Sequence, residues 1–197
     1  RQKEQKGLGH AVLTARHALG PDEPFIVSLG DIIIKGINTI DIMKRIYHRY
    51  GKSVIILFEV PREDVSKYGI AKVRKIDNDT FLIEDIVEKP SPEEAPSNYA
   101  VVGRYLFTPT IWEKLEKTKP GKGGEIQLTD AIKELLKEEA VYAYKIDSDS
   151  VFDTGNKLDY LKTVITFALE RDDINGELIE FLRQKIEEKT KKKGKKD

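Results

Sequence analysis

The chain has 197 residues, which suits one domain with a sizeable core and leaves room for a small second one. Basic and acidic side chains number 34 each, and this balance argues against a nucleic-acid scaffold, which usually carries a basic excess. Cysteine is absent, so disulfides and thiol catalysis are excluded. No apolar run approaches the roughly 18 residues of a membrane span and no signal-peptide pattern opens the sequence, so we expect a cytoplasmic protein without a membrane partner.

The composition also resembles that of proteins from thermophiles. Charged residues make up 35% of the chain, with one Met and no Cys. Ion-pair networks cost less to desolvate at high temperature, which favours such a composition there.

The beginning of the chain is polar and lacks a strand. Six polar residues precede Gly7-Leu-Gly-His-Ala, and apolar periodicity then predicts a helix over residues 10–19. Because a βα unit normally begins with a strand, we expect an amino-terminal segment to be missing before Arg1.

Strands and helices alternate in the next part. Residues 25–29 form a short apolar run, predicted to be a buried strand that ends near Asp31. Asn38 is a suitable cap for a second helix, in which Ile42, Ile46 and Tyr50 share a face and which Gly51 ends. Residues 53–60 are almost continuously apolar, which is typical of a central strand covered on both faces.

The middle of the chain is predicted to be antiparallel. Residues 61–69 suit a turn or short helix, and strands are expected over residues 70–76, 80–88 and 99–107. Asp77-Asn-Asp is the expected hairpin turn between the first two of these strands.

The remainder is mostly helical. Helices are expected over residues 109–117, 126–137, 156–171 and 175–188, with one strand over residues 141–146. The third of these helices is amphipathic. We therefore expect a domain over residues 1–172, a carboxy-terminal helix over residues 173–188 and a basic disordered tail over residues 189–197.

Charged side chains beside glycine suggest a phosphate-handling site. Asp31 and Asp153 each lie next to a glycine-containing turn at a predicted strand end, and Glu88-Lys89 closes another strand. Mg²⁺ prefers one or two carboxylates plus waters and substrate phosphates, while lysine and glycine-loop amides suit phosphate.

Each of these features also has a simpler structural explanation. A lone Asp beside Gly often caps a turn, an exposed Glu–Lys pair contributes under about 1 kcal/mol, and a glycine pair is a weak signal. His10 is more simply a packing or capping residue than an acid or base, because a phosphate nucleophile needs no general base. Trp112 is expected in the core rather than on a stacking platform.

Seven motifs occur together in order. The motifs are Gly7-Leu-Gly-His-Ala, Leu29-Gly-Asp, Val60-Pro-Arg-Glu-Asp-Val-Ser-Lys-Tyr-Gly-Ile, Val87-Glu-Lys-Pro, Ser97-Asn-Tyr-Ala-Val-Val-Gly-Arg-Tyr, Gly124-Glu-Ile-Gln-Leu-Thr-Asp-Ala and Phe152-Asp-Thr-Gly-Asn-Lys-Leu-Asp-Tyr-Leu-Lys. Together they resemble the bacterial-type UTP–glucose-1-phosphate uridylyltransferases (UDP-glucose pyrophosphorylases) over residues 2 to about 171. The wider sugar-nucleotidyltransferase group shares several of them.

The resemblance implies an α/β fold, a Rossmann-like nucleotidyltransferase sandwich with a mixed central sheet and an antiparallel extension. It also implies transfer of UMP from UTP to glucose 1-phosphate, which gives UDP-glucose and pyrophosphate with Mg²⁺ as cofactor. Homo-oligomers are possible.

The resemblance also assigns roles on the metal and phosphate side. Asp31 and Asp153 would bind Mg²⁺, and Lys89 would hold the sugar phosphate. Together they form the expected catalytic group.

The substrate-binding roles follow in the same way. Glu88 would accept hydrogen bonds from sugar hydroxyls, and Gly69 and Val101 would meet the sugar through backbone groups. Gln2 and Gly7 would read the uracil edge. Glu125 is expected to support the sugar pocket.

The family's amino-terminal strand and its Gly-rich, Arg-containing loop have no counterpart here, so turnover by this chain alone is expected to be slow. Two alternatives stay open. One is another sugar-1-phosphate nucleotidyltransferase, such as a thymidylyl enzyme, and the other is a non-catalytic sugar-nucleotide-binding module.

Overall fold

The structure is a computed structural model that describes residues 2–193. Its strands are β1 (Phe25–Ser28), β2 (Ile32–Ile34), β3 (Val54–Glu59), β4 (Gly69–Lys75), β5 (Thr80–Glu88), β6 (Tyr99–Phe107), β7 (Tyr142–Ile146) and β8 (Val151–Asp153). Its α-helices are α1 (Leu8–Thr14), α2 (Thr39–Tyr50), α3 (Ile111–Lys117), α4 (Leu128–Leu135), α5 (Lys157–Leu169) and α6 (Asn175–Lys193). Short 3₁₀ turns include Arg62–Lys67, where a turn or short helix was predicted.

Contacts divide the chain into two units. The first comprises the residues up to Gly30 together with Ile34–Val151, and the second comprises Asp31–Ile33 together with the chain from Phe152 onward. The contacts thus change at residues 151–152, whereas the sequence placed a boundary at residue 172.

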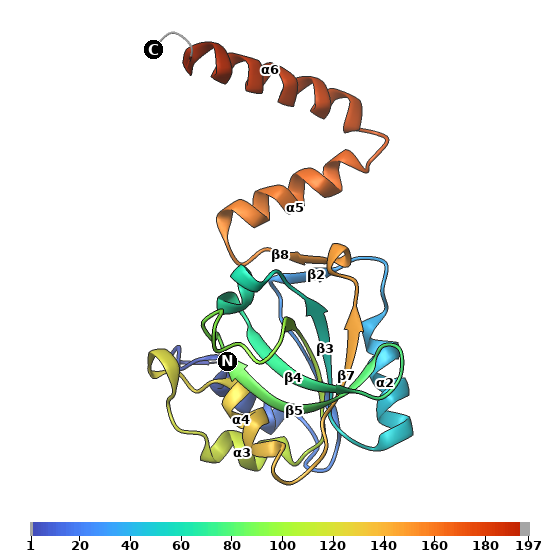
Figure 1. The fold of residues 1–197 in the computed structure, drawn as a ribbon, viewed down its shortest axis with the longest axis vertical. Coiled ribbons are helices and arrows are strands. Elements are labelled where there is room, and N and C mark those ends of the chain that lie inside the picture. Colours follow the sequence, from blue (N-terminus) through green and yellow to red (C-terminus); the bar gives the residue numbers. More distant parts are fainter. Residues whose placement is uncertain (1, 194–197) are drawn as a thin grey trace. The chain divides into compact units, whose positions relative to one another are not determined.

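A six-stranded sheet forms the centre of the first unit, in the order β1-β6-β3-β7-β5-β4. Its strands β3, β4, β5 and β7 are labelled in Figure 1. β3 and β7 run parallel, while the other neighbouring strands in this order are antiparallel. β4 and β5 form the predicted hairpin, and Ile70 of β4 also pairs with Ala100 of β6. The expected mixed sheet with an antiparallel extension is therefore confirmed.

One face of this sheet packs against α1, α3 and α4. Ile55 and Leu57 of β3 belong to one buried cluster with Trp112 of α3 and Ile132 of α4. The Trp112 ring stacks on Phe25, with centroids 4.2 Å apart and planes 9° apart. Trp112 is 3% exposed, so its predicted place in the core is confirmed.

The other face of β3 lies toward α2. Val54 and Ile56 alternate along β3 with Ile55 and Leu57 and do not belong to the first cluster, yet they are fully buried. The helix that contacts β3 here is α2. Met43 and Ile46 are the buried apolar side chains of α2. Successive residues of a strand point to opposite faces of the sheet, so a strand that is covered by helices on both faces needs apolar residues at every position. This explains the continuous apolar sequence of β3.

Two predictions in the amino-terminal part are corrected. The first helix covers Leu8–Thr14 and is followed by a 3₁₀ turn, so it does not reach residue 19. Leu19 is 39% exposed, and its helical spacing therefore reflects no buried face. Asp31 does not end a strand: β1 ends at Ser28, and Asp31 precedes β2, a strand that the sequence did not predict.

The second unit contains most of the paired strands β2 and β8 together with α5 and α6. Phe152 packs edge-on against Phe167 of α5, at 5.0 Å between ring centroids. Several apolar residues of the amphipathic helix α5 are exposed: Leu158, Leu161 and Val164 are 62%, 55% and 45% exposed. Periodicity therefore identified a shared face but not a covering partner.

The last helix extends further than expected. α6 continues to Lys193, so residues 189–193 are helical where a disordered tail was predicted, and residues 194–197 lie outside the described residues. None of the helices within residues 2–193 is long and apolar enough to cross a membrane.

Candidate functional site

The predicted site residues fall into three groups, and the first surrounds Gly7. This residue has φ 95°, in the left-handed region, and a Cβ there would lie 2.8 Å from both Glu125 Cβ and the Ile126 carbonyl oxygen. Two residues further on, the Gly9 N–H donates a hydrogen bond to the same Ile126 carbonyl at 2.8 Å. Glycine is therefore required at position 7 by both conformation and space.

Gln2 lies over the same loop. Its side-chain amide nitrogen, Nε2, donates to the Gly7 carbonyl at 3.3 Å and lies 2.8 Å from His10 Nδ1. Gln2, Gly7 and Glu125 are thus brought together at the glycine loop.

The second group surrounds Gly69 at the start of β4. A Cβ on Gly69 would lie 2.7 Å from Thr129 Cγ2, 3.4 Å from Glu88 Oε2 and 3.9 Å from Val101 Cγ2. Three strands and α4 therefore converge on one glycine. Thr129, which is 6% exposed, donates its hydroxyl hydrogen to Glu88 Oε2 at 2.9 Å and so fixes that carboxylate.

Lys89 follows Glu88 directly and has an unusual backbone. Its φ is 45°, the left-handed region, and its N–H donates to the Tyr68 carbonyl at 3.0 Å. Its ammonium lies 3.9 Å from Glu88 Oε1, and half of the side chain is exposed. The predicted ion pair is therefore present, and solvent limits its strength.

Asp31 and Asp153 form the third group, in the second unit. A Cβ on Gly155 would lie 3.0 Å from Asp153 Oδ1 and 3.2 Å from Asp31 Oδ2, so both carboxylates reach the same point. Thr154 donates its N–H and its hydroxyl hydrogen to the Asp31 carbonyl, each at 2.8 Å. Gly155 N–H donates to Asp153 Oδ1 at 2.8 Å.

The donor chemistry of this pair fits Mg²⁺. Within residues 2–193 no group of three or more His, Cys, Asp or Glu side chains is arranged to hold a metal. Mg²⁺ does not require such a group, because it keeps several waters and uses one or two carboxylates plus substrate phosphates. Two hard oxygen donors from Asp31 and Asp153 meet that need.

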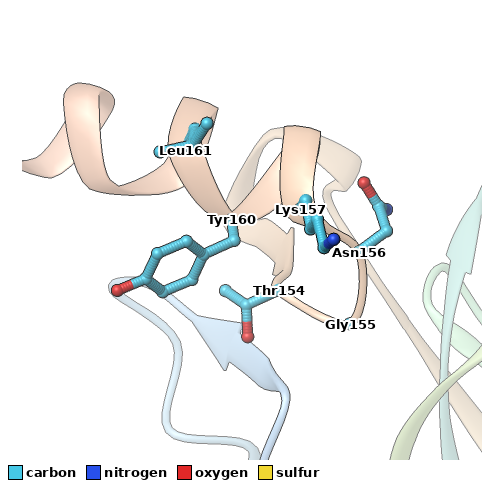
Figure 2. Close-up of a pocket in the computed structure, with 6 residues that line it drawn as sticks. All are labelled: Thr154, Gly155, Asn156, Lys157, Tyr160 and Leu161. Carbon is cyan, nitrogen blue, oxygen red and sulfur yellow. The ribbon is translucent and has the colours of Figure 1, made fainter.

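A pocket of about 410 Å³ opens beside this pair, at the start of α5 (Figure 2). Asn156 is the N-cap of the helix and accepts from Asp159 N–H at 3.0 Å. Figure 2 shows Asn156 and Lys157 at the helix start, with Tyr160 and Leu161 further along. Hydroxyl, amide and ammonium groups can thus meet a polar ligand here.

Two residues near these groups were not predicted as site residues. Thr129 lies in the Gly124-Glu-Ile-Gln-Leu-Thr motif, so the motif itself was the available signal. His10 was expected to be a packing or capping residue, but its ring contacts Gln2. No periodicity in the sequence indicates either contact.

Comparisons with curated proteins find close relatives. UTP–glucose-1-phosphate uridylyltransferase 1 of Staphylococcus saprophyticus is 44% identical over 184 residues, 93% of this chain and 63% of the relative. The uridylyltransferase of Pseudomonas aeruginosa is 44% identical over 165 residues, 82% of this chain and 58% of the relative. The chain thus spans about three fifths of the length of these relatives.

Solved structures give the same picture. UDP-glucose pyrophosphorylase complexed with UDP-glucose has 40% identity and a TM-score of 0.82, covering 87% of this chain and 65% of that one. The UTP-bound enzyme of Acinetobacter baumannii has 37% identity and a TM-score of 0.79, and the match covers 92% of this chain and 63% of that one. The Nucleotidyl transferase family model matches residues 1–168. With this match over most of its length, the chain belongs to the nucleotidyl transferase family.

Proposed function

We propose that this chain carries the base-, sugar- and metal-binding part of a UTP–glucose-1-phosphate uridylyltransferase. The observation that carries the proposal is the convergence of Asp31 and Asp153 on Gly155, although 121 residues separate them in the sequence. The relatives that share over 40% of their aligned residues with this chain bear that name, which supports the choice of reaction.

In the proposed reaction, an oxygen of the glucose 1-phosphate phosphate attacks the α-phosphorus of UTP. The new P–O bond forms as the bond from the α-phosphorus to the bridging oxygen breaks, and pyrophosphate leaves with that oxygen. No proton transfer is needed, so the protein acts through positioning and charge neutralisation.

Asp31 and Asp153 would hold Mg²⁺. When bound, the ion would neutralise and orient phosphate oxygens. Thr154 supports this arrangement because its two hydrogen bonds to the Asp31 backbone hold the two segments together. Gly155 leaves the space between the carboxylates open, since any side chain there would contact both.

Glu88 would accept hydrogen bonds from glucose hydroxyls. Thr129 occupies one lone pair of its Oε2, which orients the carboxylate while the other lone pairs stay available. Gly69 would let the sugar approach the backbone of β4, and Val101 would meet the sugar from β6. Lys89 would hold the sugar phosphate as a point charge.

Gln2 and Gly7 would read the uracil edge, with Glu125 behind Gly7. An amide side chain carries an acceptor oxygen, which suits a base edge that presents an N–H group. The close approach of Gly7 to Glu125 and Ile126 fixes the backbone from which this reading is made.

Calorimetric titration of UDP-glucose with and without Mg²⁺ tests the metal assignment. We expect Asp31→Asn and Asp153→Asn each to weaken the Mg²⁺-dependent part of binding at least about tenfold. Asp149→Asn is the matched control, because this exposed carboxylate lies four residues from Asp153 and outside the pair. Unchanged Mg²⁺ dependence in both single variants would show that the pair holds no metal.

The reaction itself is tested by pyrophosphate release with UTP and dTTP, each against several sugar 1-phosphates. We expect UTP with glucose 1-phosphate to be the preferred combination. A preference for dTTP would instead favour a thymidylyl enzyme.

A further inference from the structure

The side chain of Gln2 is held at its nitrogen end by two partners. Nε2 lies 3.3 Å from the Gly7 carbonyl oxygen and 2.8 Å from His10 Nδ1. A carbonyl oxygen only accepts, so the Gly7 contact identifies this end of the amide as the donor. With both N–H groups engaged, the opposite end, Oε1, is presented as an acceptor.

This arrangement also defines the state of His10. Because Gln2 Nε2 carries only donors, His10 Nδ1 must accept, which requires a neutral ring with its proton on Nε2. Within residues 2–193 no protein donor contacts Gln2 Oε1. The acceptor oxygen is therefore available to a ligand.

His10 is well placed to act as a fixed support. It lies in the first turn of α1, directly after Gly9, whose N–H bonds the Ile126 carbonyl at 2.8 Å. Thr14 donates its hydroxyl hydrogen to the His10 carbonyl at 2.8 Å, one turn further on. The ring is half-buried and borders a cavity of about 330 Å³, so it can be replaced without opening the core.

We propose that His10 is a positioning residue that fixes the amide of Gln2 with its carbonyl oxygen toward the base, and so selects a base with an N–H at that point. This inference rests on the proposed function, in which Gln2 reads the base. Uracil carries a hydrogen on N3 and can donate it to the Gln2 carbonyl oxygen. Cytosine presents a lone pair at N3, which that oxygen repels.

Without His10, only the 3.3 Å contact with the Gly7 carbonyl would fix the direction of the Gln2 amide. The reversed amide would point its N–H groups toward the base and would accept cytosine, at the loss of only the long contact with Gly7. One neutral hydrogen bond corresponds to about a tenfold change in an equilibrium constant. We therefore expect His10 to contribute about tenfold to discrimination between UTP and CTP.

Calorimetry with UTP and CTP tests this on the 197-residue chain. His10→Leu removes the acceptor and should lower the ratio of the CTP to the UTP dissociation constant about tenfold. His10→Asn places a carbonyl oxygen near the position of histidine Nδ1 and should restore most of that ratio. His17→Leu, at an exposed histidine, should leave it unchanged.

A double-mutant cycle separates positioning from general destabilisation. In a Gln2→Ala background, His10→Leu should have no further effect on the ratio, because the residue acts only through Gln2. An equal effect in both backgrounds would overturn the proposal. A wild-type chain that binds no uridine nucleotide would instead overturn the proposed function, and the inference with it.

One measurement needs no variant at all. A ¹⁵N spectrum of the histidine rings should show His10 protonated on Nε2, with Nδ1 accepting. Protonation of His10 on Nδ1 in the neutral chain would overturn the proposal even if UTP is strongly preferred.

Discussion

At the scale of single residues, Lys89 combines a strained backbone with a proposed function. Among residues 2–193 it is the only residue other than glycine with a positive φ, 45°. For a side chain with a Cβ, the left-handed region is unfavourable by about 1–2 kcal/mol. The hydrogen bond from its N–H to the Tyr68 carbonyl holds this conformation directly after the end of β5. Such strain is often found at binding sites.

Replacing Lys89 separates strain from function. Lys89→Gly should be about 1 kcal/mol more stable than Lys89→Ala in urea unfolding, because glycine adopts positive φ without a Cβ clash. This reverses the usual order of the two residues. Both variants should weaken UDP-glucose binding far more than uridine binding, if Lys89 holds the sugar phosphate. Equal losses for the two ligands would remove Lys89 from the site.

The buried side chain of Tyr105 should make the free energy of unfolding depend on pH in the alkaline range. Burial raises the pKa of its phenol well above the ordinary value, and the negative charge of Glu88 raises it further. The folded state therefore retains a proton that the unfolded state releases above about pH 10. The stabilisation is complete below pH 10 and is lost as pH rises toward the folded pKa, by up to about 1.4 kcal/mol per pH unit.

Urea unfolding of the wild-type chain and of Tyr105→Phe between pH 8 and 11 measures this effect. The difference in unfolding free energy between the two should change in favour of Tyr105→Phe above about pH 10. Tyr160→Phe, at a residue that is 52% exposed, is the control and should follow the wild-type curve. A constant difference between Tyr105→Phe and wild type would contradict the assignment.

At the scale of elements, strong local signals made the sequence informative. β5 and β6 have the bounds that the sequence predicts, and α2 begins after Asn38, whose side chain accepts from Asp41 N–H. Gly51 ends α2 in the left-handed conformation, φ 64°. β2 was missed because it has only three residues and is defined by its pairing with β8, which no local pattern shows.

A buried polar network joins three elements of the first unit. Glu139, between α4 and β7, accepts the hydroxyl hydrogens of Thr108 at 2.6 Å and Ser53 at 3.3 Å. Lys52 pairs with its other oxygen at 3.2 Å, and the Glu139 side chain is 7% exposed. The network thus links the beginning of β3, the end of β6 and the segment before β7.

Removal of Glu139 should therefore be costly. Glu139→Ala leaves two buried hydroxyls with fewer partners and should lower the unfolding free energy by about 2–3 kcal/mol in urea titration. Glu134→Ala is the control, because this exposed residue forms an i,i+3 pair with Lys137, and its loss should be under about 0.5 kcal/mol. Similar small losses in both variants would show that the network contributes little.

At the scale of the whole molecule, local patterns proposed which residues form the candidate site but did not indicate how those residues are arranged. Ordered motifs identified Asp31 and Asp153, but their convergence depends on β2 and on Gly155, which no periodicity indicates. The contact of Thr129 with Glu88 joins residues 41 positions apart, and only tertiary packing determines it. Long-range contacts of this kind are the part of the structure that cannot be predicted from a single sequence.

The two units also differ in how much they bury, which predicts different local stability. Residues Val54 to Leu57 of β3 are fully buried, whereas Thr163 is the only buried residue of α5. Amides with few buried contacts around them exchange through local opening rather than global unfolding. In hydrogen-exchange mass spectrometry, α5 and α6 amides should therefore exchange at least about a hundredfold faster than those of β3.

The matched control for this measurement is α2, which buries Met43 and Ile46. It has 12 residues, compared with 13 in α5. Because helix length is nearly equal, faster exchange in α5 than in α2 reports burial rather than fraying. Exchange should be measured at two protein concentrations, since a homo-oligomer that covers the exposed stripe at Leu158, Leu161 and Val164 would slow α5 at the higher one. Exchange of α5 as slow as that of α2 at both concentrations would contradict the expectation, because it would require burial of α5 that the isolated chain does not provide.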